Sequence, residues 1–190
     1  PWAAYLANGT LIYGSGVSGQ YVYRSTNNGN SWTAPVLSVS GNDRNTLAAE
    51  ETGTGPFANY LYAAITPGNF ARSTDGGLTW AQTYTISNTI PGTMIAVGPN
   101  GSTNGGCVIY VSNTGSTAAC VYTFNRSTNG GASGSFTAVS NISDAGYVGT
   151  LNTAGRLVIN NARTRPYPMI AMDNSNGPYR GRLYLSLIHI

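Results

Sequence analysis

Short apolar segments recur along the chain, and each is followed by a turn rich in Gly or Asn and by a second segment that contains a tyrosine. The pairs begin at residues 2, 47, 95 and 170 and reach Tyr13, Tyr62, Tyr110 and Tyr184. Short apolar runs bounded by turn residues predict β-strands. The first three pairs recur with a period of roughly 45–50 residues, which is typical of a four-stranded repeating unit. We therefore predict an all-β chain.

A polar motif follows each of the first three pairs. Its positions are Ser25, Asn27, Gly29 and Trp32 in the first copy, Ser73, Asp75, Gly77 and Trp80 in the second, and Ser127, Asn129, Gly131 and Phe136 in the third. A short carboxylate or amide can accept hydrogen bonds from the inward-pointing amides of a tight turn, and glycine reaches a positive φ at little cost. The aromatic side chain can fold back over the turn and become buried. We therefore expect three hairpin loops, each closed by its own side chains.

The motif, Ser-x-Asp/Asn-x-Gly-x-x-Trp, resembles the Asp box, or BNR repeat, of sialidase-like β-propellers. The third copy departs from it, with two extra residues before Phe136. The resemblance implies a partial propeller of four-stranded antiparallel blades with Asp-box hairpins. Residues 1–186 would form one repeat domain, with blades at about 1–40, 41–89 and 90–167 and the start of a fourth at 168–186. A propeller closes with roughly 4–8 blades, so we expect an incomplete fragment that self-associates through its exposed blade faces.

The last six residues match the translation of a transposon end sequence used to prepare DNA libraries. This favours a non-native tail at residues 187–190 and gives His189 no catalytic role. The alternative interpretation is a native strand that continues the segment ending at Tyr184.

The composition contains 25 glycines, 13 tyrosines and only 8% charged residues, which suits short strands and tight turns rather than helices. The net charge of +3 comes from arginines scattered along the chain. A nucleic-acid-binding surface would need clustered basic residues, and a membrane helix would need roughly 20 apolar residues in succession. We expect neither a nucleic-acid partner nor a membrane span.

Two cysteines, Cys107 and Cys120, flank a possible turn near Asn113 and Thr114. If a hairpin is centred on that turn, the two cysteines lie opposite one another and can form a cross-strand disulfide. Such a bond would indicate a location outside the cytoplasm. The alternative is a pair of buried thiols. Two cysteines without a native histidine do not make a zinc site, and we expect neither a metal nor a cofactor.

Sialidase-like enzymes have an Arg-x-Pro element, three arginines that bind a substrate carboxylate, a Tyr/Glu pair and an aspartate acid/base. The chain has no Arg-x-Pro, and no catalytic residue can be assigned from the resemblance. Arg44, Arg163 and Arg165 precede first strands of predicted blades, which makes them candidates for ligand binding.

Glycoside hydrolysis needs two carboxylates that face each other across the scissile bond. The acids outside the motif are Asp43, Glu50, Glu51, Asp144 and Asp173. Neighbouring strand residues point to opposite faces, so Glu50 and Glu51 cannot act as such a pair. The hypothesis is therefore a non-catalytic, secreted or cell-surface propeller segment that binds a glycan or a protein surface, or serves as an adhesive structure. The alternative is a fragment of a sialidase-like or other Asp-box glycoside hydrolase.

Overall fold

The computed structural model describes residues 1–16, 18–116, 119–144, 149–163 and 167–186. Every regular element in this part of the chain is a β-strand, which confirms the all-β prediction. Consequently the described residues include no helix that could cross a membrane.

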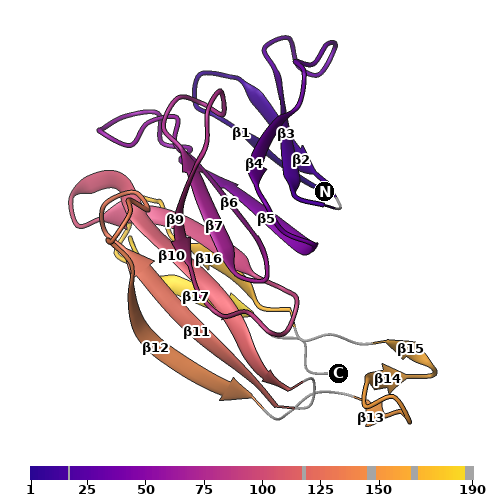
Figure 1. Ribbon diagram of the computed structural model, residues 1–190. Coiled ribbons are helices and arrows are strands. Elements are labelled where there is room, and N and C mark those ends of the chain that lie inside the picture. Colours follow the sequence, from indigo (N-terminus) through magenta and orange to yellow (C-terminus); the bar gives the residue numbers. More distant parts are fainter. Residues whose placement is uncertain (17, 117–118, 145–148, 164–166, 187–190) are drawn as a thin grey trace.

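Three four-stranded sheets follow one another along the chain (Figure 1). The first sheet contains β1 (Trp2–Tyr5), β2 (Leu11–Ser15), β3 (Gln20–Ser25) and β4 (Val36–Val39). The second contains β5 (Asp43–Ala49), β6 (Leu61–Thr66), β7 (Asn69–Ser73) and β8 (Ala81–Thr85). The third contains β9 (Met94–Asn100), β10 (Thr103–Ser116), β11 (Ala119–Ser127) and β12 (Thr137–Asp144). Each strand pairs antiparallel with the next, which confirms the predicted four-stranded antiparallel sheets.

Two smaller sheets complete the described chain. The strands β13 (Thr150–Leu151), β14 (Leu157–Ile159) and β15 (Ala162–Arg163) form a three-stranded sheet that stands apart from the others in Figure 1. The strands β16 (Met169–Met172) and β17 (Leu183–Ser186) form the last sheet. Within the described ranges, no sheet closes on itself.

The sheets stack in chain order, with their first strands adjacent. Strand β5 lies between β1 and β9, and β16 contacts the other side of β9. A sheet can therefore bury one face against the sheet before it in the chain and the other against the sheet after it. We call these the preceding face and the following face.

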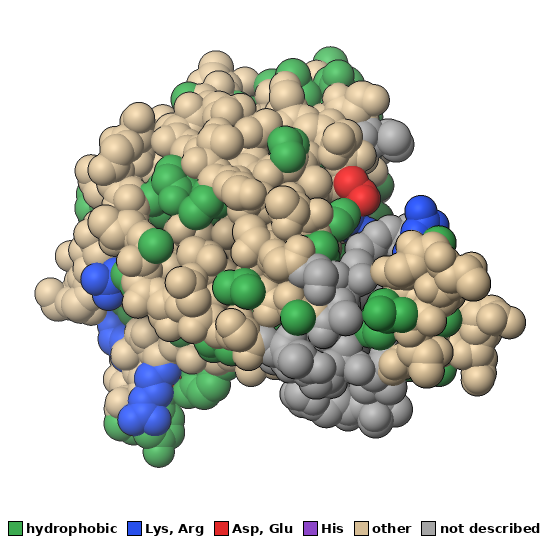
Figure 2. Space-filling view, turned by 60° about the horizontal axis from the view of Figure 1, so that its bottom comes forward, with side chains coloured by type: hydrophobic (Ala, Val, Ile, Leu, Met, Phe, Trp, Pro, Cys, Tyr) green, Lys and Arg blue, Asp and Glu red, His purple; other side chains and the backbone are tan. Residues whose placement is uncertain are grey.

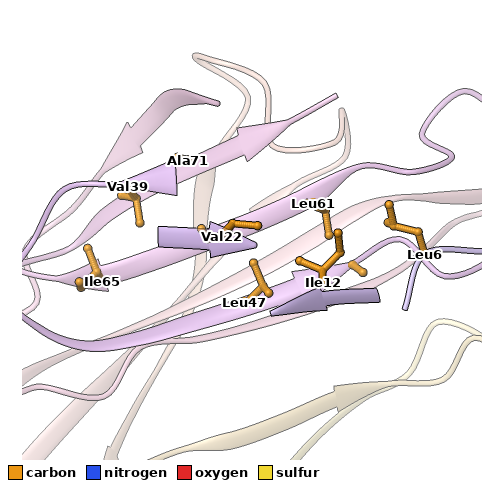
Figure 3. Packing of buried hydrophobic residues seen from close by; sticks show 10 residues of the cluster. Leu6, Ile12, Val22, Val39, Leu47, Leu61, Ile65 and Ala71 are labelled. Atoms are coloured by element: carbon orange, nitrogen blue, oxygen red, sulfur yellow. The ribbon is translucent and has the colours of Figure 1, made fainter. Parts of the chain in front are cut away.

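The interface between the first and second sheets is aliphatic (Figure 3). Ile12 and Val22 point from the following face of the first sheet toward Leu61 and its neighbours on the preceding face of the second. Alternate residues of a strand share a face, so the apolar residues of each strand reach the same interface. Each buried Leu, Ile or Val stabilises the fold by about 1.5–3 kcal/mol.

The interface between the second and third sheets is aromatic. Phe70 of the second sheet lies 5.6 Å from Tyr110 of the third, measured between ring centroids. Phe136 packs on Phe70 at 4.9 Å and on Tyr84 at 4.5 Å. Tyr62 is fully buried in the same cluster.

The tyrosines that suggested the repeat are not all equivalent in the fold. In each sheet the motif serine pairs with one residue of the second strand, namely Leu11 with Ser25, Leu61 with Ser73 and Val108 with Ser127. Tyr13 and Tyr110 come two residues after this pair, whereas Tyr62 comes one residue after it. Tyr62 therefore points to the following face, and aligning it with Tyr13 and Tyr110 was wrong by one residue.

The predicted disulfide between Cys107 and Cys120 is also wrong. The hairpin does not turn at Asn113 and Thr114, because β10 and β11 remain paired up to Ser116 and Ala119. Cys120 pairs with Gly115 of β10, eight positions along the strand from Cys107, which corresponds to roughly 25 Å. Both thiols are buried and no disulfide joins them, so they give no evidence for a location outside the cytoplasm. Burial raises the pKa of the Cys107 thiol, and the nearby Arg126 partly opposes this shift.

Candidate functional site

The second motif copy forms a hairpin loop held by its own side chains. The Ser73 hydroxyl donates to Asp75 Oδ1 at 2.7 Å and accepts from the Gly77 amide at 2.8 Å. Asp75 Oδ1 also accepts from the amides of Leu78 and Thr79 at 3.0 and 2.9 Å, and Oδ2 accepts from the Thr79 hydroxyl at 2.6 Å. The carboxylate thus satisfies the inward-pointing donors of the turn.

Hydrogen bonding lowers the pKa of Asp75. Desolvation is the largest single influence and raises the pKa, but the hydrogen bonds from Thr79, Ser73 and Leu78 together outweigh it. Donors that bind the ionised form stabilise it relative to the protonated acid. The loop is therefore held most tightly when Asp75 carries its charge.

The first motif loop repeats this arrangement with an amide. The Ser25 hydroxyl donates to Asn27 Oδ1 at 2.9 Å and accepts from the Gly29 amide at 2.8 Å. Asn27 Oδ1 accepts from the Ser31 amide at 2.9 Å, and Asn27 Nδ2 donates to the Ser31 hydroxyl at 2.8 Å. A neutral amide replaces the charged acceptor, so these bonds are individually weaker.

The third motif loop uses a second serine. The Gly131 amide donates to the Ser127 hydroxyl at 3.0 Å. The oxygen of this hydroxyl lies 2.7 Å from the Ser135 hydroxyl oxygen, within hydrogen-bonding distance. Ser135 in turn donates to the Ala132 carbonyl at 2.6 Å, and the Asn129 amide donates to Ser127 Oγ at 3.1 Å. The two extra residues of this copy are accommodated in the loop that presents Ser135.

The aromatic residues that end the motifs differ in burial. Trp80 packs against the aliphatic interface and Phe136 against the aromatic one. Trp32 remains 42% exposed, and its indole N–H donates to the Gly29 carbonyl at 3.1 Å. The expected burial of Trp32 is incomplete because no described sheet lies against the preceding face of the first sheet.

Two arginines connect neighbouring motif loops, which the sequence analysis missed. Arg24 Nε donates to the Gly76 carbonyl at 2.7 Å, and Arg72 Nη1 donates to the Gly130 carbonyl at 2.8 Å. Each arginine comes directly before a motif serine and reaches the loop of the next sheet. The repetition of this arginine, which includes Arg126, was the available sequence signal. The motif loops are therefore part of the contact between sheets.

A pocket of about 310 Å³ opens where the first strands of the four stacked sheets begin. Its lining comprises Pro1, Trp2, Arg44, Asn45, Gly92, Thr93, Met94, Tyr167 and Met169. These residues are distant in sequence, and the stacking of β1, β5, β9 and β16 brings them together. Apart from Arg44, no sequence signal marked them.

Arg44 and Tyr167 form one side of the pocket. The Arg44 guanidinium carbon lies 4.7 Å from the centroid of the Tyr167 ring, a cation–π geometry. Its Nε lies 3.8 Å from Asp43 Oδ1, and both side chains remain about half exposed. A positive φ of 51° at Arg44 interrupts the regular strand at this point.

Two polar side chains of the lining have buried atoms with unused hydrogen-bonding capacity. Thr93 is only 3% exposed, and its Oγ1 has no hydrogen-bond partner among the described residues. Asn45 Nδ2 also has no hydrogen-bond partner among the described residues. The backbone carbonyl of Asn45, by contrast, accepts from Trp2 Nε1 at 2.6 Å. Leaving a buried polar atom unsatisfied costs about 1–3 kcal/mol. Both atoms are closed off from solvent, so a side-chain rotation is needed before either can bind a ligand or a water molecule.

The structure places two other described candidates, Glu50 and Asp173, outside this pocket. Arg163 belongs to β15, whereas Arg165 and residues 187–190 lie outside the described part of the chain. Glu50 is buried and accepts from the Thr52 amide and hydroxyl at 3.1 and 2.6 Å. Asp173 is a turn residue whose pKa is lowered by hydrogen bonds from Ser175.

None of the described lining residues is an Asp or a Glu, so this part of the lining contains no pair of facing carboxylates. Within the described ranges, no group of three or more His, Cys, Asp or Glu side chains could hold a metal ion. Charged side chains are sparse on the face in Figure 2, where hydrophobic side chains are scattered among the backbone and other uncharged side chains. Comparison of the chain with protein-family models, with curated proteins and with solved structures gave no match.

Proposed function

We propose that this chain is part of a β-propeller that binds a glycan at the pocket beside Arg44. The propeller interpretation is supported by three successive four-stranded antiparallel sheets whose first strands lie side by side. It is also supported by the motif loops, which recur at the same place in each sheet and are linked by Arg24 and Arg72.

The observation that carries the glycan proposal is the mixed chemistry of the pocket. The rings of Trp2 and Tyr167 offer apolar surface suited to the C–H face of a sugar. The exposed Arg44 guanidinium can bind the hydroxyls or a negatively charged substituent of the sugar. Asn45 and Thr93 can add hydrogen bonds if their side chains rotate toward the ligand. A volume of about 310 Å³ is at the lower end of the range for ligand pockets, which suits about one or two sugar units.

The proposal includes a location outside the cell, as a secreted or cell-surface binding or adhesive module. Its support is the low charge and the abundance of Gly, Asn, Ser and Thr. The second candidate is a glycoside hydrolase fragment, favoured by the Asp43 carboxylate next to Arg44. That reaction would need a second carboxylate facing the first.

A glycan array followed by titration calorimetry with the best glycan tests the proposal. Arg44→Ala should weaken binding by about tenfold or more, because hydrogen bonds to a charged group contribute about 1.5–3 kcal/mol. Arg156→Ala is the matched control, since Arg156 is an exposed arginine outside the pocket. Absence of binding to any glycan, or equal effects of the two variants, would contradict the proposal. Release of free sugar would favour the hydrolase.

A further inference from the structure

The positive charge of Arg44 is already balanced at the pocket. Among the described lining residues, Arg44 alone has a charged side chain. Its Nε lies 3.8 Å from Asp43 Oδ1, and its guanidinium carbon lies 4.7 Å from the centroid of the Tyr167 ring. The face of an aromatic ring has a negative partial charge. The guanidinium therefore has two sources of negative charge beside it before any ligand binds.

The backbone fixes both partners of this arrangement. The positive φ of Arg44 coincides with a shift in the register of β5 with β6 between Asp43 and Thr46, and such a bulge redirects a side chain. Gly92 supports the ring, because a Cβ atom at this position would overlap Tyr167. The close approach of Arg44, Asp43 and Tyr167 is thus built into the fold.

The pair of Arg44 and Asp43 keeps its hydrogen-bonding capacity. At 3.8 Å the two groups form an ion pair but not a hydrogen bond, and neither side chain is hydrogen-bonded to another described residue. A sugar hydroxyl both donates and accepts, so it can accept from the guanidinium and donate to the carboxylate. An ionised carboxylate or sulfate only accepts, so it can use Arg44 but not Asp43.

Asp43 also opposes an anionic ligand directly. Any anion that binds the Arg44 guanidinium comes within a few ångströms of the Asp43 carboxylate. Two like charges about 4 Å apart in water repel each other by an energy that corresponds to about a fivefold loss of affinity. The described lining offers no second cationic side chain to offset this loss.

We propose that the pocket selects uncharged sugars over acidic ones and that Asp43 sets this preference. The inference rests on the proposed glycan binding and narrows it, because the Arg44 guanidinium then binds hydroxyl groups and not a negatively charged substituent. Asp43 has two effects in this scheme. It accepts a hydrogen bond from a sugar hydroxyl and repels a carboxylate or sulfate at the same place.

Titration calorimetry with matched pairs of sugars tests the preference. Glycans that end in glucose or galactose are compared with those that end in glucuronate or galacturonate, which differ only in the charged group. Wild type should bind the neutral member at least about fivefold more tightly. Asp43→Asn keeps an acceptor but removes the charge, so affinity for the acidic member should rise about fivefold and affinity for the neutral member should change less than threefold.

Glu51→Gln is the matched control, because it removes the same charge from an exposed residue beyond the other end of β5 and outside the pocket lining. It should leave both affinities unchanged. Tighter binding of the acidic members by wild type would overturn the preference while glycan binding itself stands. Equal effects of Asp43→Asn and Glu51→Gln would overturn the role of Asp43. Absence of binding to every sugar would overturn both the preference and the proposed function.

A second measurement needs no variant. Binding of a neutral sugar exchanges no net charge, so its affinity should stay within about twofold between low and high salt. A steep loss of affinity with added salt would show that an ionic contact dominates and would contradict the proposal. This readout remains decisive if Asp43→Asn fails to fold, which circular dichroism checks.

Discussion

The two interfaces between the four-stranded sheets join equivalent faces but use different side chains. The first joins Ile12 and Val22 to small and aliphatic partners such as Ala63, whereas the second joins Phe70 to Tyr110. Ala63 and Tyr110 occupy equivalent positions in their sheets. Close packing therefore depends on the summed volume across an interface and on apolar alternation, and not on one preferred residue at each position.

Truncation of Phe70 tests the aromatic interface with the largest expected effect. Phe70→Ala removes a fully buried ring that contacts Tyr62, Tyr110 and Phe136, and should lower the free energy of unfolding by about 3–5 kcal/mol. Leu61→Ala at the aliphatic interface should cost about 2–5 kcal/mol and is the comparison variant. Chemical denaturation measures both. A loss below about 1 kcal/mol for Phe70→Ala would show that this ring is not packed as described.

The second motif loop is closed by a charged carboxylate, whereas the third is closed by neutral hydroxyl groups. Asp75→Ala leaves the turn amides of the second loop without their acceptor and should cost about 1–3 kcal/mol at neutral pH. Ser135→Ala in the third loop removes neutral hydrogen bonds and should cost about 0.5–1.5 kcal/mol. Equal losses would contradict a special role for the carboxylate.

The contribution of Asp75 should also depend on pH. Its pKa in the folded chain lies below the ordinary value of 3.8, so its stabilisation is complete above that value. The stabilisation is lost as the pH falls from about 4 through the lowered pKa. The difference in melting temperature between wild type and Asp75→Asn should therefore shrink in acid. A difference that stays constant between neutral and acidic pH would exclude this linkage.

The arginine contacts should contribute similarly at both interfaces. Arg24→Ala and Arg72→Ala each remove a hydrogen bond to a carbonyl of the next loop and should each cost about 1 kcal/mol. Arg126 is exposed and occupies the same motif position in the last copy, so Arg126→Ala should have almost no effect on thermal unfolding. If Arg126→Ala lowered stability as much as the other two substitutions, the hydrogen bond to the next motif loop would not explain the contribution of these arginines.

Buried hydroxyl groups allow the smallest and most discriminating test. The Tyr62 hydroxyl has no hydrogen-bond partner among the described residues, and burial and the charge of Glu50 raise its pKa. Tyr62→Phe should leave stability unchanged or raise it by up to about 1 kcal/mol. Tyr84→Phe is the control, since it loses a hydrogen bond of 3.1 Å to Asn125 and should cost about 0.5–1.5 kcal/mol. Destabilisation by Tyr62→Phe as large as by Tyr84→Phe would indicate a partner for the Tyr62 hydroxyl.

Much of the local architecture could be read from the chain, whereas the candidate site could not. Arg44 was singled out because it precedes a first strand, but Trp2, Thr93 and Tyr167 join it only through the stacking of separate sheets. Arg163 had the same kind of sequence support as Arg44, yet it belongs to the separate sheet of β13–β15. Position before a strand is therefore insufficient to predict a shared site.

The sequence by itself determined the strands and the motif loops. Strand alternation is a property of neighbouring residues, and the hydrogen bonds of Ser73 and Asp75 join atoms within the same few residues. The tertiary structure decided the register of β10 with β11, which separates Cys107 from Cys120, and the burial that distinguishes Trp80 from Trp32. These outcomes depend on packing between distant segments, because a shift of one residue or a missing neighbouring sheet changes which side chains are covered.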